Sequence, residues 1–305
     1  MLPIQVIGSL NIDLTVVLPR FHLPGETLTG QDFRVYPGGK GGNQAVAAAR
    51  LGAQVYFVGM VGEDDNGRLY QRVMQEEGIR ADGVGITSEA PTGVALIEVD
   101  SKGENRIAVV PGANALVEDA FVEEKQGYPP EKKVCMLQLE IPLYSVTRAA
   151  QRARQRGDIV VLDPAPAIPL QDSLLGYVDY ITPNEGELSR LTGLPTGTLE
   201  EAEAAARQLL ERGAGHVVAK LGGNGCLYVD QERAIHAPGF QVKVVDTTAA
   251  GDSFNAGLAF ALANGYETER MLRFANAVGA CSTTGAGAQS AMPTFEQAEA
   301  MLKRD

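Results

Sequence analysis

The segment Asp246-Thr-Thr-Ala-Ala-Gly-Asp252 places a carboxylate beside a run of small residues. We expect a strand to end at Asp246 and a helix to begin near Ala250. At the positive end of such a helix, unobstructed backbone N–H groups form an anion site. Here those groups would belong to Ala249, Ala250 and Gly251. The segment therefore predicts a place where a phosphate could be held next to a carboxylate.

Asp252 lies in the first turn of this expected helix. Spacing alone leaves two interpretations open, a helix-start carboxylate favoured by the dipole or the base of a phosphoryl transfer. Because the dipole lowers the pKa of an aspartate at this place, we expect Asp252 to be a positioned acceptor for a hydroxyl proton and not a strong base. Phosphoryl transfer tolerates this, since its loose transition state depends mainly on where the hydroxyl is held.

A second candidate is the glycine-rich segment Gly38-Gly-Lys-Gly-Gly-Asn-Gln44. It fails the phosphate-loop pattern, because Gly41 follows Lys40 where Ser or Thr is required. It also fails the dinucleotide pattern, because Gln44 occupies the place of the third glycine. Two interpretations remain, a glycine-rich helix cap or a loop of close approach to a ligand, with Asn43 at the start of a helix and Lys40 available to that ligand.

Asn11 and Asp13 follow a short apolar run, residues 4–8, that is typical of a buried strand. Asn and Asp are common turn formers. At the carboxyl end of a strand, however, an amide and a carboxylate could together grip a diol of a polyhydroxylated substrate. Both interpretations stay open on the residues alone.

Composition excludes several classes of protein. The chain has 305 residues, 45% of them hydrophobic, and a formal net charge of −12. This acidity argues against nucleic acid or an anionic membrane as a partner. Three scattered cysteines without a CxxC pair predict neither disulfides nor a zinc site. We find no signal-peptide pattern at the start and no membrane-spanning window, so we expect a soluble cytoplasmic protein.

The elements that must position these residues alternate between strand and helix. Strands are expected at residues 4–8, 55–58, 134–137, 159–162, 180–182 and 216–221, with helices between them, and helices at 250–263, 268–284 and 294–303. This alternation predicts a mostly parallel sheet covered on both faces, with ligands at the carboxyl ends of its strands. Residues 94–99 and 106–110 predict a hairpin, which could form a small separate sheet with strands at 15–18 and 33–36.

Taken together, the motifs resemble those of the ribokinase-type family of sugar kinases, from residue 4 to about residue 300. The resemblance is carried in one order by Gly8-Ser-Leu-Asn-Ile-Asp13, Gly38–Gln44, Thr92-Gly-Val-Ala95, Gly103-Glu-Asn105, Pro111-Gly-Ala-Asn114, Thr182-Pro-Asn-Glu-Gly-Glu187 and Asp246–Asp252. It implies a three-layer α/β/α sandwich with a mostly parallel central sheet, formed by a single domain over residues 1–305. It also implies a discontinuous β lid from about 14–37 and 93–111.

The resemblance also implies a role for each matching residue. Asp252 would be the general base, and Ala249, Ala250 and Gly251 the anion hole. The sugar-binding set would be Asn11, Asp13, Gly39, Lys40, Asn43 and Glu140. The nucleotide-binding set would be Asn184, Lys220, Gly222, Gly223, Gly225 and Asn276. Glu187 would orient magnesium through water, and a potassium ion would be held by Asp246, Thr248, Ser282, Gly285, Gly287 and Ala291.

Two residues depart from the family pattern. Lys220 stands where Thr is common, although its charge could reach a phosphate. Ala291 stands where a Ser often supplies a side-chain oxygen to the potassium ion, so most ligands of that ion would be backbone carbonyls.

The implied activity is the ATP-dependent phosphorylation of the primary hydroxyl of D-ribose, with Mg²⁺ required and K⁺ as an activator. A homodimer formed through the lid is also implied. The alternatives are a kinase for deoxyribose, fructose, 2-keto-3-deoxygluconate or a nucleoside, or a relative that binds sugar without catalysis. Arg106 in the lid hairpin is the one hint of an acid sugar.

Overall fold

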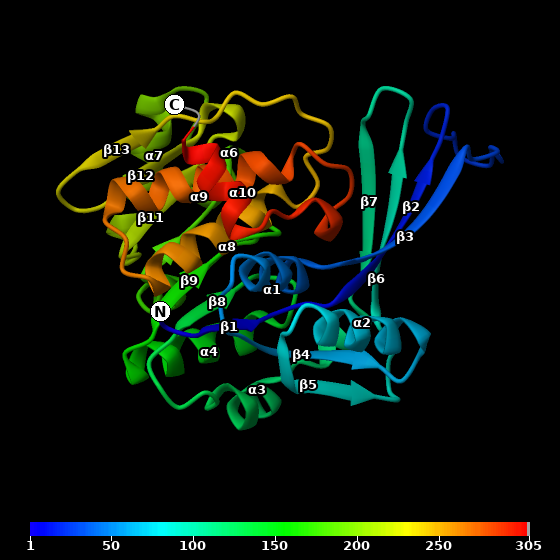
Figure 1. Ribbon diagram of the computed structural model, residues 1–305, viewed down its shortest axis with the longest axis horizontal. Helices are drawn as coiled ribbons and strands as arrows, with labels where there is room; N and C mark the ends of the chain where they lie inside the picture. Colours follow the sequence, from blue (N-terminus) through cyan, green and yellow to red (C-terminus); the bar gives the residue numbers. More distant parts are fainter. Residues whose placement is uncertain (304–305) are drawn as a thin grey trace.

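A nine-stranded sheet forms the centre of the molecule in the computed structural model, which describes residues 1–303 (Figure 1). Its strands lie in the order β13-β12-β11-β10-β9-β8-β1-β4-β5. Their bounds are β1 Ile4–Ile7, β4 Val55–Gly62, β5 Arg80–Thr87, β8 Val134–Leu137, β9 Ile159–Leu162, β10 Tyr180–Ile181, β11 His216–Lys220, β12 Cys226–Val229 and β13 Ala234–Ala237. All neighbours from β5 to β11 are parallel, and β12 and β13 add an antiparallel edge. The expected mostly parallel sheet is confirmed.

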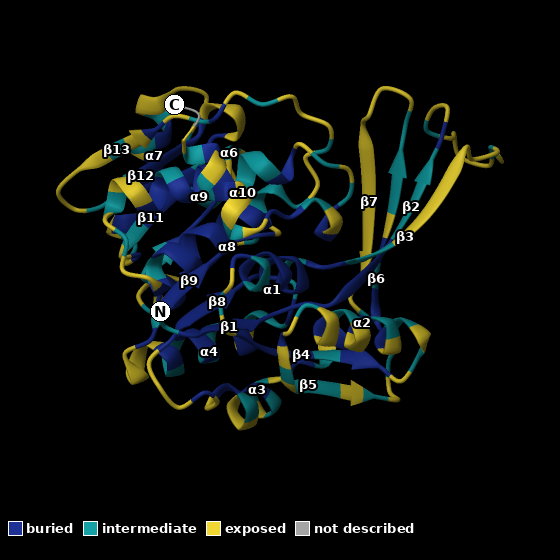
Figure 2. Ribbon diagram, in the orientation of Figure 1, coloured by how far each residue is buried: buried dark blue, intermediate teal, exposed yellow. Residues whose placement is uncertain are grey.

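Helices cover both faces of this sheet, because its central strands are apolar on both sides. In β8, Met136 belongs to one core cluster, whereas its neighbours Cys135 and Leu137 belong to the other. The first cluster includes α1 Lys40–Arg50, α2 Asp65–Glu76, α8 Ala250–Ala263, α9 Thr268–Ser282 and α10 Phe295–Leu302. The second includes α3 Asp119–Gln126, α4 Leu143–Arg156, α5 Asp172–Leu175, α6 Glu185–Thr192 and α7 Leu199–Glu211. Buried segments accordingly fill the body in Figure 2.

A second sheet of four strands projects from the body beside α1 and α2 (Figure 1). Its order is β3-β2-β6-β7, with bounds β2 Asn11–Val17, β3 Asp32–Gly38, β6 Gly93–Val99 and β7 Asn105–Val110. The β2–β6 pair is parallel and the other two pairs are antiparallel. At the base of the sheet, Asn11 lies opposite both Gly38 and Gly93. The expected small sheet is confirmed.

Several local expectations need correction. No strand ends at Asp246, because residues 238–249 form a strandless connection packed along the edge of α9. Helix α1 begins at Lys40, three residues before Asn43, and Asn11 and Asp13 lie inside β2 instead of in a turn. Strand β5 and helices α3 and α5 were not expected. Short 3₁₀ helices, also unexpected, occupy Gly112–Leu116, Gly222–Asn224 and Gln289–Ala291. Over residues 1–303, no helix is long and apolar enough to cross a membrane.

Candidate active site

The carboxyl ends of neighbouring strands bring most of the predicted site residues together. Glu140, Asp163, Asn184 and Lys220 follow or end β8, β9, β10 and β11, which are adjacent in the sheet. Since all four strands are parallel, their carboxyl ends meet at one edge, where such folds bind ligands. The start of α8 faces the same edge, because Lys220 and Asp163 share a cavity with residues 249–252.

The start of α8 has the features expected of an anion site. Ala249 is the N-cap residue, with φ 57 and ψ 17, and no side chain caps the helix. It is the one non-glycine residue with a positive φ over residues 1–303. This left-handed backbone is rare for a residue with a Cβ atom. It turns the chain sharply into the helix and leaves the first N–H groups free of side-chain partners.

Asp252 is held by two amide side chains. Its Oδ2 accepts a hydrogen bond from Asn43 Nδ2 at 3.0 Å, and its Oδ1 accepts one from Gln44 Nε2 at 3.1 Å. The carboxylate is 6% exposed. Both donors lie on α1, which packs against α8. A carboxylate that only favoured the start of the helix would face solvent, whereas Asp252 is buried and hydrogen-bonded to two side chains.

The expectation of a lowered pKa for Asp252 is wrong. Burial raises the pKa of Asp252 to about 6, although Lys40 and the two amides act in the opposite direction and Asp163 adds repulsion. The cost of moving an ion away from water exceeds the effect of the helix dipole here. A carboxyl with this pKa is mostly ionised at neutral pH and is a better proton acceptor than an exposed aspartate.

The predicted sugar-binding residues surround Asp252 on the side of the small sheet. Asn11 Oδ1 accepts a hydrogen bond from Asn114 Nδ2 at 2.7 Å. Glu140 Oε2 accepts the hydroxyl of Ser9 and the backbone N–H of Lys40, the latter at 3.0 Å. Burial, Glu140 and Asp252 raise the pKa of Asp13 to about 7. Asp13 therefore lies close enough to Glu140 and Asp252 for their charges to act on it.

Gly39 belongs to this set through its backbone. It is the N-cap residue of α1, with φ 83, and a Cβ atom there would lie 2.7 Å from the backbone nitrogen of Asn11. The glycine-rich segment therefore starts a helix, and at Gly39 it approaches the backbone of β2 closely. Close approach to a ligand, the other interpretation left open by the sequence, stays a prediction.

Lys40 supplies positive charge at the centre of the site. Burial alone would lower its pKa, but Asp252, Asp163, Glu140 and Glu187 together raise the pKa of Lys40 above its ordinary value. Its ammonium group is therefore charged at any working pH. An anion entering the site would meet this charge together with the N–H groups of α8.

The cavity beside Asp252 has a volume of about 460 Å³ and contains the predicted phosphate-orienting residues. Lys220 Nζ donates to Asp163 Oδ1 at 2.9 Å. Asn184 and Glu187 form a capping box at the start of α6, each accepting the other's backbone N–H at 2.8 Å. Their side chains therefore support the helix as well as line the cavity. Burial raises the pKa of Glu187, although Lys220 opposes it.

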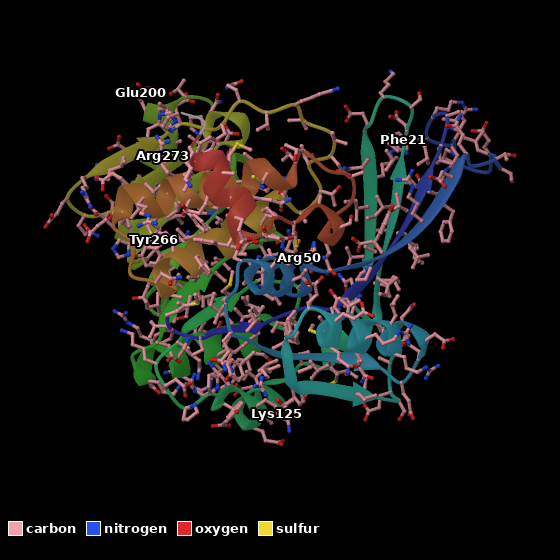
Figure 3. All side chains as sticks on the ribbon, viewed as in Figure 1. Phe21, Arg50, Lys125, Glu200, Tyr266 and Arg273 are labelled. Atoms are coloured by element: carbon pink, nitrogen blue, oxygen red, sulfur yellow. The ribbon has the colours of Figure 1, made fainter. Side chains whose placement is uncertain are left out.

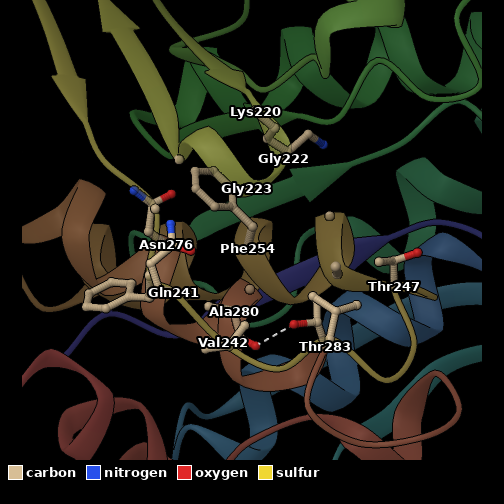
Figure 4. A pocket seen from close by; sticks show the side chains of 17 residues that line it. Lys220, Gly222, Gly223, Gln241, Val242, Thr247, Phe254, Asn276, Ala280 and Thr283 are labelled. Atoms are coloured by element: carbon tan, nitrogen blue, oxygen red, sulfur yellow. Dashed lines mark hydrogen bonds between the residues drawn. The ribbon is translucent and has the colours of Figure 1, made fainter. Parts of the chain in front are cut away.

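A second cavity, of about 340 Å³, continues from the first past Lys220 and Gly251 (Figure 4). It includes all the predicted nucleotide residues except Asn184. Phe254, Ala280 and Val242 give it an apolar part, and Gly222 and Gly223 leave one wall without side chains. Asn276 Nδ2 donates to the carbonyls of Ala237 and Pro238, at 3.0 and 3.2 Å. A cavity with an apolar part that leads to an anion site suits a nucleotide.

Several residues of the predicted potassium loop lie close together. Asp246 Oδ1 accepts from the backbone and hydroxyl of Thr248, and its Oδ2 accepts from Gly287 N at 2.9 Å. A Cβ atom on Gly285 would lie 3.0 Å from that of Ala291. Ser282 donates its hydroxyl to Gly279 O, at 2.8 Å, and so faces its own helix. Residues 246–248 and 285–291 thus lie side by side.

Sequence reasoning missed four polar residues at the site. Asp163 was detectable, since it directly follows the expected strand at 159–162. Gln44 and Asn114 lie within the motifs that carry the resemblance, but no role was assigned to either. Gln138, whose Nε2 donates to Gln44 Oε1 at 2.7 Å, was detectable in the same way as Asp163, since it directly follows the expected strand at 134–137.

Comparisons with known proteins show which family of enzymes the chain is similar to. The model of the pfkB family of carbohydrate kinases matches residues 1–295. A ribokinase of Haemophilus influenzae is 40% identical over 96% of both chains, and a deoxyribokinase of Salmonella typhi is 35% identical over 96% of both. The structure of Arabidopsis thaliana ribokinase complexed with ribose and ATP matches with a TM-score of 0.90 and 34% identity, covering 100% of this chain and 99% of that one.

The buried carboxylate, the uncapped start of α8 and the adjoining cavity suit phosphoryl transfer, and the family model and the relatives cover almost the whole chain. The chain therefore belongs to the pfkB family of carbohydrate kinases, and its activity is that of an ATP-dependent sugar kinase.

Proposed function

We propose that the enzyme transfers the γ-phosphoryl group of ATP to the primary hydroxyl of D-ribose, giving ribose 5-phosphate and ADP. The observation that carries this proposal is the buried Asp252. It is joined by Asn43 to the sugar-binding side and lies in the same cavity as the anion site of α8. Ribokinases among the relatives support ribose as the sugar.

In the proposed reaction, Asn11, Asp13, Asn43 and Glu140 hold the sugar hydroxyls, and Asp252 accepts the proton of the primary hydroxyl as its oxygen attacks phosphorus. The bond between the γ-phosphorus and its bridging oxygen breaks, and ADP leaves. The N–H groups of residues 249–251 and the ammonium of Lys40 stabilise charge on the transferred group. Lys220 would leave Asp163 to pair with the phosphates.

The residues present also fit the implied metal ions. Carboxylate oxygens suit Mg²⁺, and Asp163 and Glu187 line the phosphate cavity. No cluster of three potential ligand side chains occurs among residues 1–303, which fits an ion bound mainly to ATP and water. Bound Mg²⁺ would neutralise phosphate charge, with Glu187 orienting its water. The Asp246 carboxylate, with loop carbonyls, would suit K⁺ even though Ala291 offers no side-chain oxygen.

A sugar panel tests the substrate. ADP release is measured with D-ribose, 2-deoxy-D-ribose, D-fructose, 2-keto-3-deoxygluconate and a nucleoside, and we expect the highest kcat/KM with ribose. A preference for deoxyribose would show that ribose is the wrong substrate but would leave the proposed phosphoryl transfer intact. No turnover with any of these compounds would refute the kinase activity. Arg106 does not favour an acid sugar, because its guanidinium lies 4.1 Å from the ring centre of Phe21 at the tip of the small sheet (Figure 3).

The role of Asp252 has its own test. Asp252→Asn should lower kcat by about 10²–10⁴-fold, the usual contribution of a general base, while ribose affinity changes little. Isothermal titration with ribose separates binding from turnover. Activity within about tenfold of the parent would show that Asp252 is not the base.

We further propose that residues 14–37 and 93–111 form a lid on a single domain, and that two copies of the chain associate through it. The face of the small sheet opposite Asp13 is apolar, with Phe33 62%, Val35 44%, Leu96 48% and Val110 48% exposed. Exposed apolar surface of this kind marks an interaction site. Figure 2 shows β7 and much of β3 as exposed.

Light scattering coupled to gel filtration tests the dimer. We expect the parent chain to be a dimer and Leu96→Asp to be a monomer. Ile86→Asp is the matched control, because Ile86 is even more exposed than Leu96, at 58% against 48%, but lies on the edge strand β5 of the main sheet. A monomeric parent, or a dimer unaffected by Leu96→Asp, would refute the interface.

A further inference from the structure

A chain of buried hydrogen bonds leads from the backbone of the glycine-rich segment to Asp252. The Tyr70 hydroxyl donates to Gly38 O at 2.6 Å. Gln289 Nε2 donates to the Tyr70 oxygen at 3.0 Å and to Asn43 Oδ1 at 3.2 Å. Asn43 Nδ2 then donates to Asp252 Oδ2 at 3.0 Å. The four residues whose side chains form this series of hydrogen bonds are each at most 7% exposed.

The donors and acceptors of this chain permit one direction only. A tyrosine hydroxyl has a single hydrogen, and here it is committed to the Gly38 carbonyl, so the oxygen of Tyr70 must accept. The nitrogen of Gln289 must therefore face Tyr70 and Asn43. Since that nitrogen donates, Asn43 presents its oxygen to Gln289 and its nitrogen to Asp252. A backbone carbonyl thus fixes the orientation of an amide that contacts the base.

Neighbouring residues leave room for this series of hydrogen bonds and hold its members in place. A Cβ atom on Gly42 would lie 1.8 Å from the Tyr70 hydroxyl, so only glycine leaves room for that hydroxyl against α1. The guanidinium of Arg50, at the end of α1, donates to the backbone carbonyl of Gln289 and pairs with Glu77. The short 3₁₀ helix that includes Gln289 is thereby tied to α1 and α2.

From these contacts we infer that Gln289, with Tyr70 behind it, is a positioning residue that holds the Asn43 amide with its nitrogen toward Asp252. The inference rests on the proposed role of Asp252 as the base. Asp252 also has an independent support, because Gln44 contacts its other oxygen and is itself oriented by Gln138. Loss of Gln289 should therefore weaken the base without removing it from its place.

Gln289→Met tests the inference, because it removes the donor and keeps the length of the side chain. Without that donor the Asn43 amide is free to turn its oxygen toward Asp252, which disfavours the ionised carboxylate. We expect kcat to fall about tenfold and the acid limb of kcat/KM to move up by about one pH unit, the effect of one hydrogen bond to a charged group. The KM for ATP should not change.

The other charges that face Asp252 stay in place in this variant. They are Lys40 on α1, Asp163 after β9, Asp13 on β2 and Glu140 after β8. Gln71→Met, at an exposed position of α2 beside Tyr70, is the matched control and should behave as the parent. Tyr70→Phe should move the acid limb of kcat/KM in the same direction as Gln289→Met but by a smaller amount. It replaces Gln289→Met as the test variant if Gln289→Met fails to fold.

Two measurements separate positioning from general damage. In an Asn43→Ala background, Gln289→Met should shift the acid limb by less than about 0.3 pH unit, because the residue through which it acts is gone. Titration of the ¹³C-labelled Asp252 carboxyl by NMR follows the same shift without turnover, so it stands even if the proposed sugar is wrong. An unchanged Asp252 titration in Gln289→Met, or a full effect without Asn43, would overturn the inference.

Discussion

Replacing Asp13 by Asn should make the protein more stable above neutral pH while it impairs sugar binding. Asp13 is 8% exposed. Burial, followed by repulsion from Glu140 and Asp252, raises the pKa of Asp13 to about 7. An ionised Asp13 therefore destabilises the folded chain, and an uncharged amide of the same shape should relieve this.

The pH window follows from the two pKa values of Asp13. In the unfolded chain the carboxyl titrates near its ordinary value of 3.8, and in the folded chain near 7. Between these values only the folded state keeps the proton, so the free energy of unfolding falls as the pH rises. Above 7 the loss is complete, and a shift of about 3 pKa units corresponds to at most about 4 kcal/mol. With relaxation of the surroundings, we expect a gain of about 1–3 kcal/mol at pH 8 and almost none at pH 4.

Urea denaturation at pH 8 and pH 4, without sugar, measures this difference. Asp82→Asn is the matched control, since Asp82 is exposed on β5 and should change stability by less than about 0.5 kcal/mol at either pH. A loss of stability in Asp13→Asn at pH 8, or an equal gain at both pH values, would refute the argument. Isothermal titration with ribose should show weaker binding at the same time.

Three further outcomes are expected. The acid limb of kcat/KM should lie near pH 6, because burial raises the pKa of Asp252 to about 6 and the protonated form cannot accept the hydroxyl proton; a limb below pH 5 would contradict this. Lys220→Met should raise the KM for ATP about tenfold or more, because a charged contact to the phosphates is lost. An equal rise in the KM for ribose, measured by steady-state kinetics, would count against this role of Lys220. Ala249→Gly should raise stability by about 1 kcal/mol by relieving the left-handed backbone at φ 57. A lower melting temperature in that variant would disprove the strain.

Much of the main sheet was predictable because its strands have simple patterns. The run at residues 4–7 is buried on both faces, as an uninterrupted apolar strand of a parallel sheet should be. Strand β5 was missed because it is a half-buried edge strand that contains Asp82, Gly83 and Gly85, which are all poor strand formers. Residues near Asp246 resemble a strand in their valines, but no neighbouring strand pairs with them.

The residues of the site were more predictable than their electrostatics. Motif spacing identified Asp252 and Asn43, but the sequence does not say that α1 covers Asp252. The sign of its pKa shift depends on that burial, so the dipole argument alone gave the wrong direction. The partners Gln289 and Tyr70 were not predictable either, because they are 219 residues apart in the chain and no local pattern links them.

The glycines where the small sheet meets the body set a limit on how the enzyme could be redesigned. A Cβ atom on Gly38 would lie 2.3 Å from the Asp13 carboxylate, and one on Gly93 would lie 2.3 Å from the side chains of Asn11 and Asn114. At both positions the space that a side chain would need is already filled by residues predicted to bind the sugar, so only glycine lets Asp13 and Asn11 keep their places. Mutant libraries that vary this region to change the choice of sugar should therefore leave Gly38 and Gly93 fixed, because a larger residue there would displace Asp13 or Asn11.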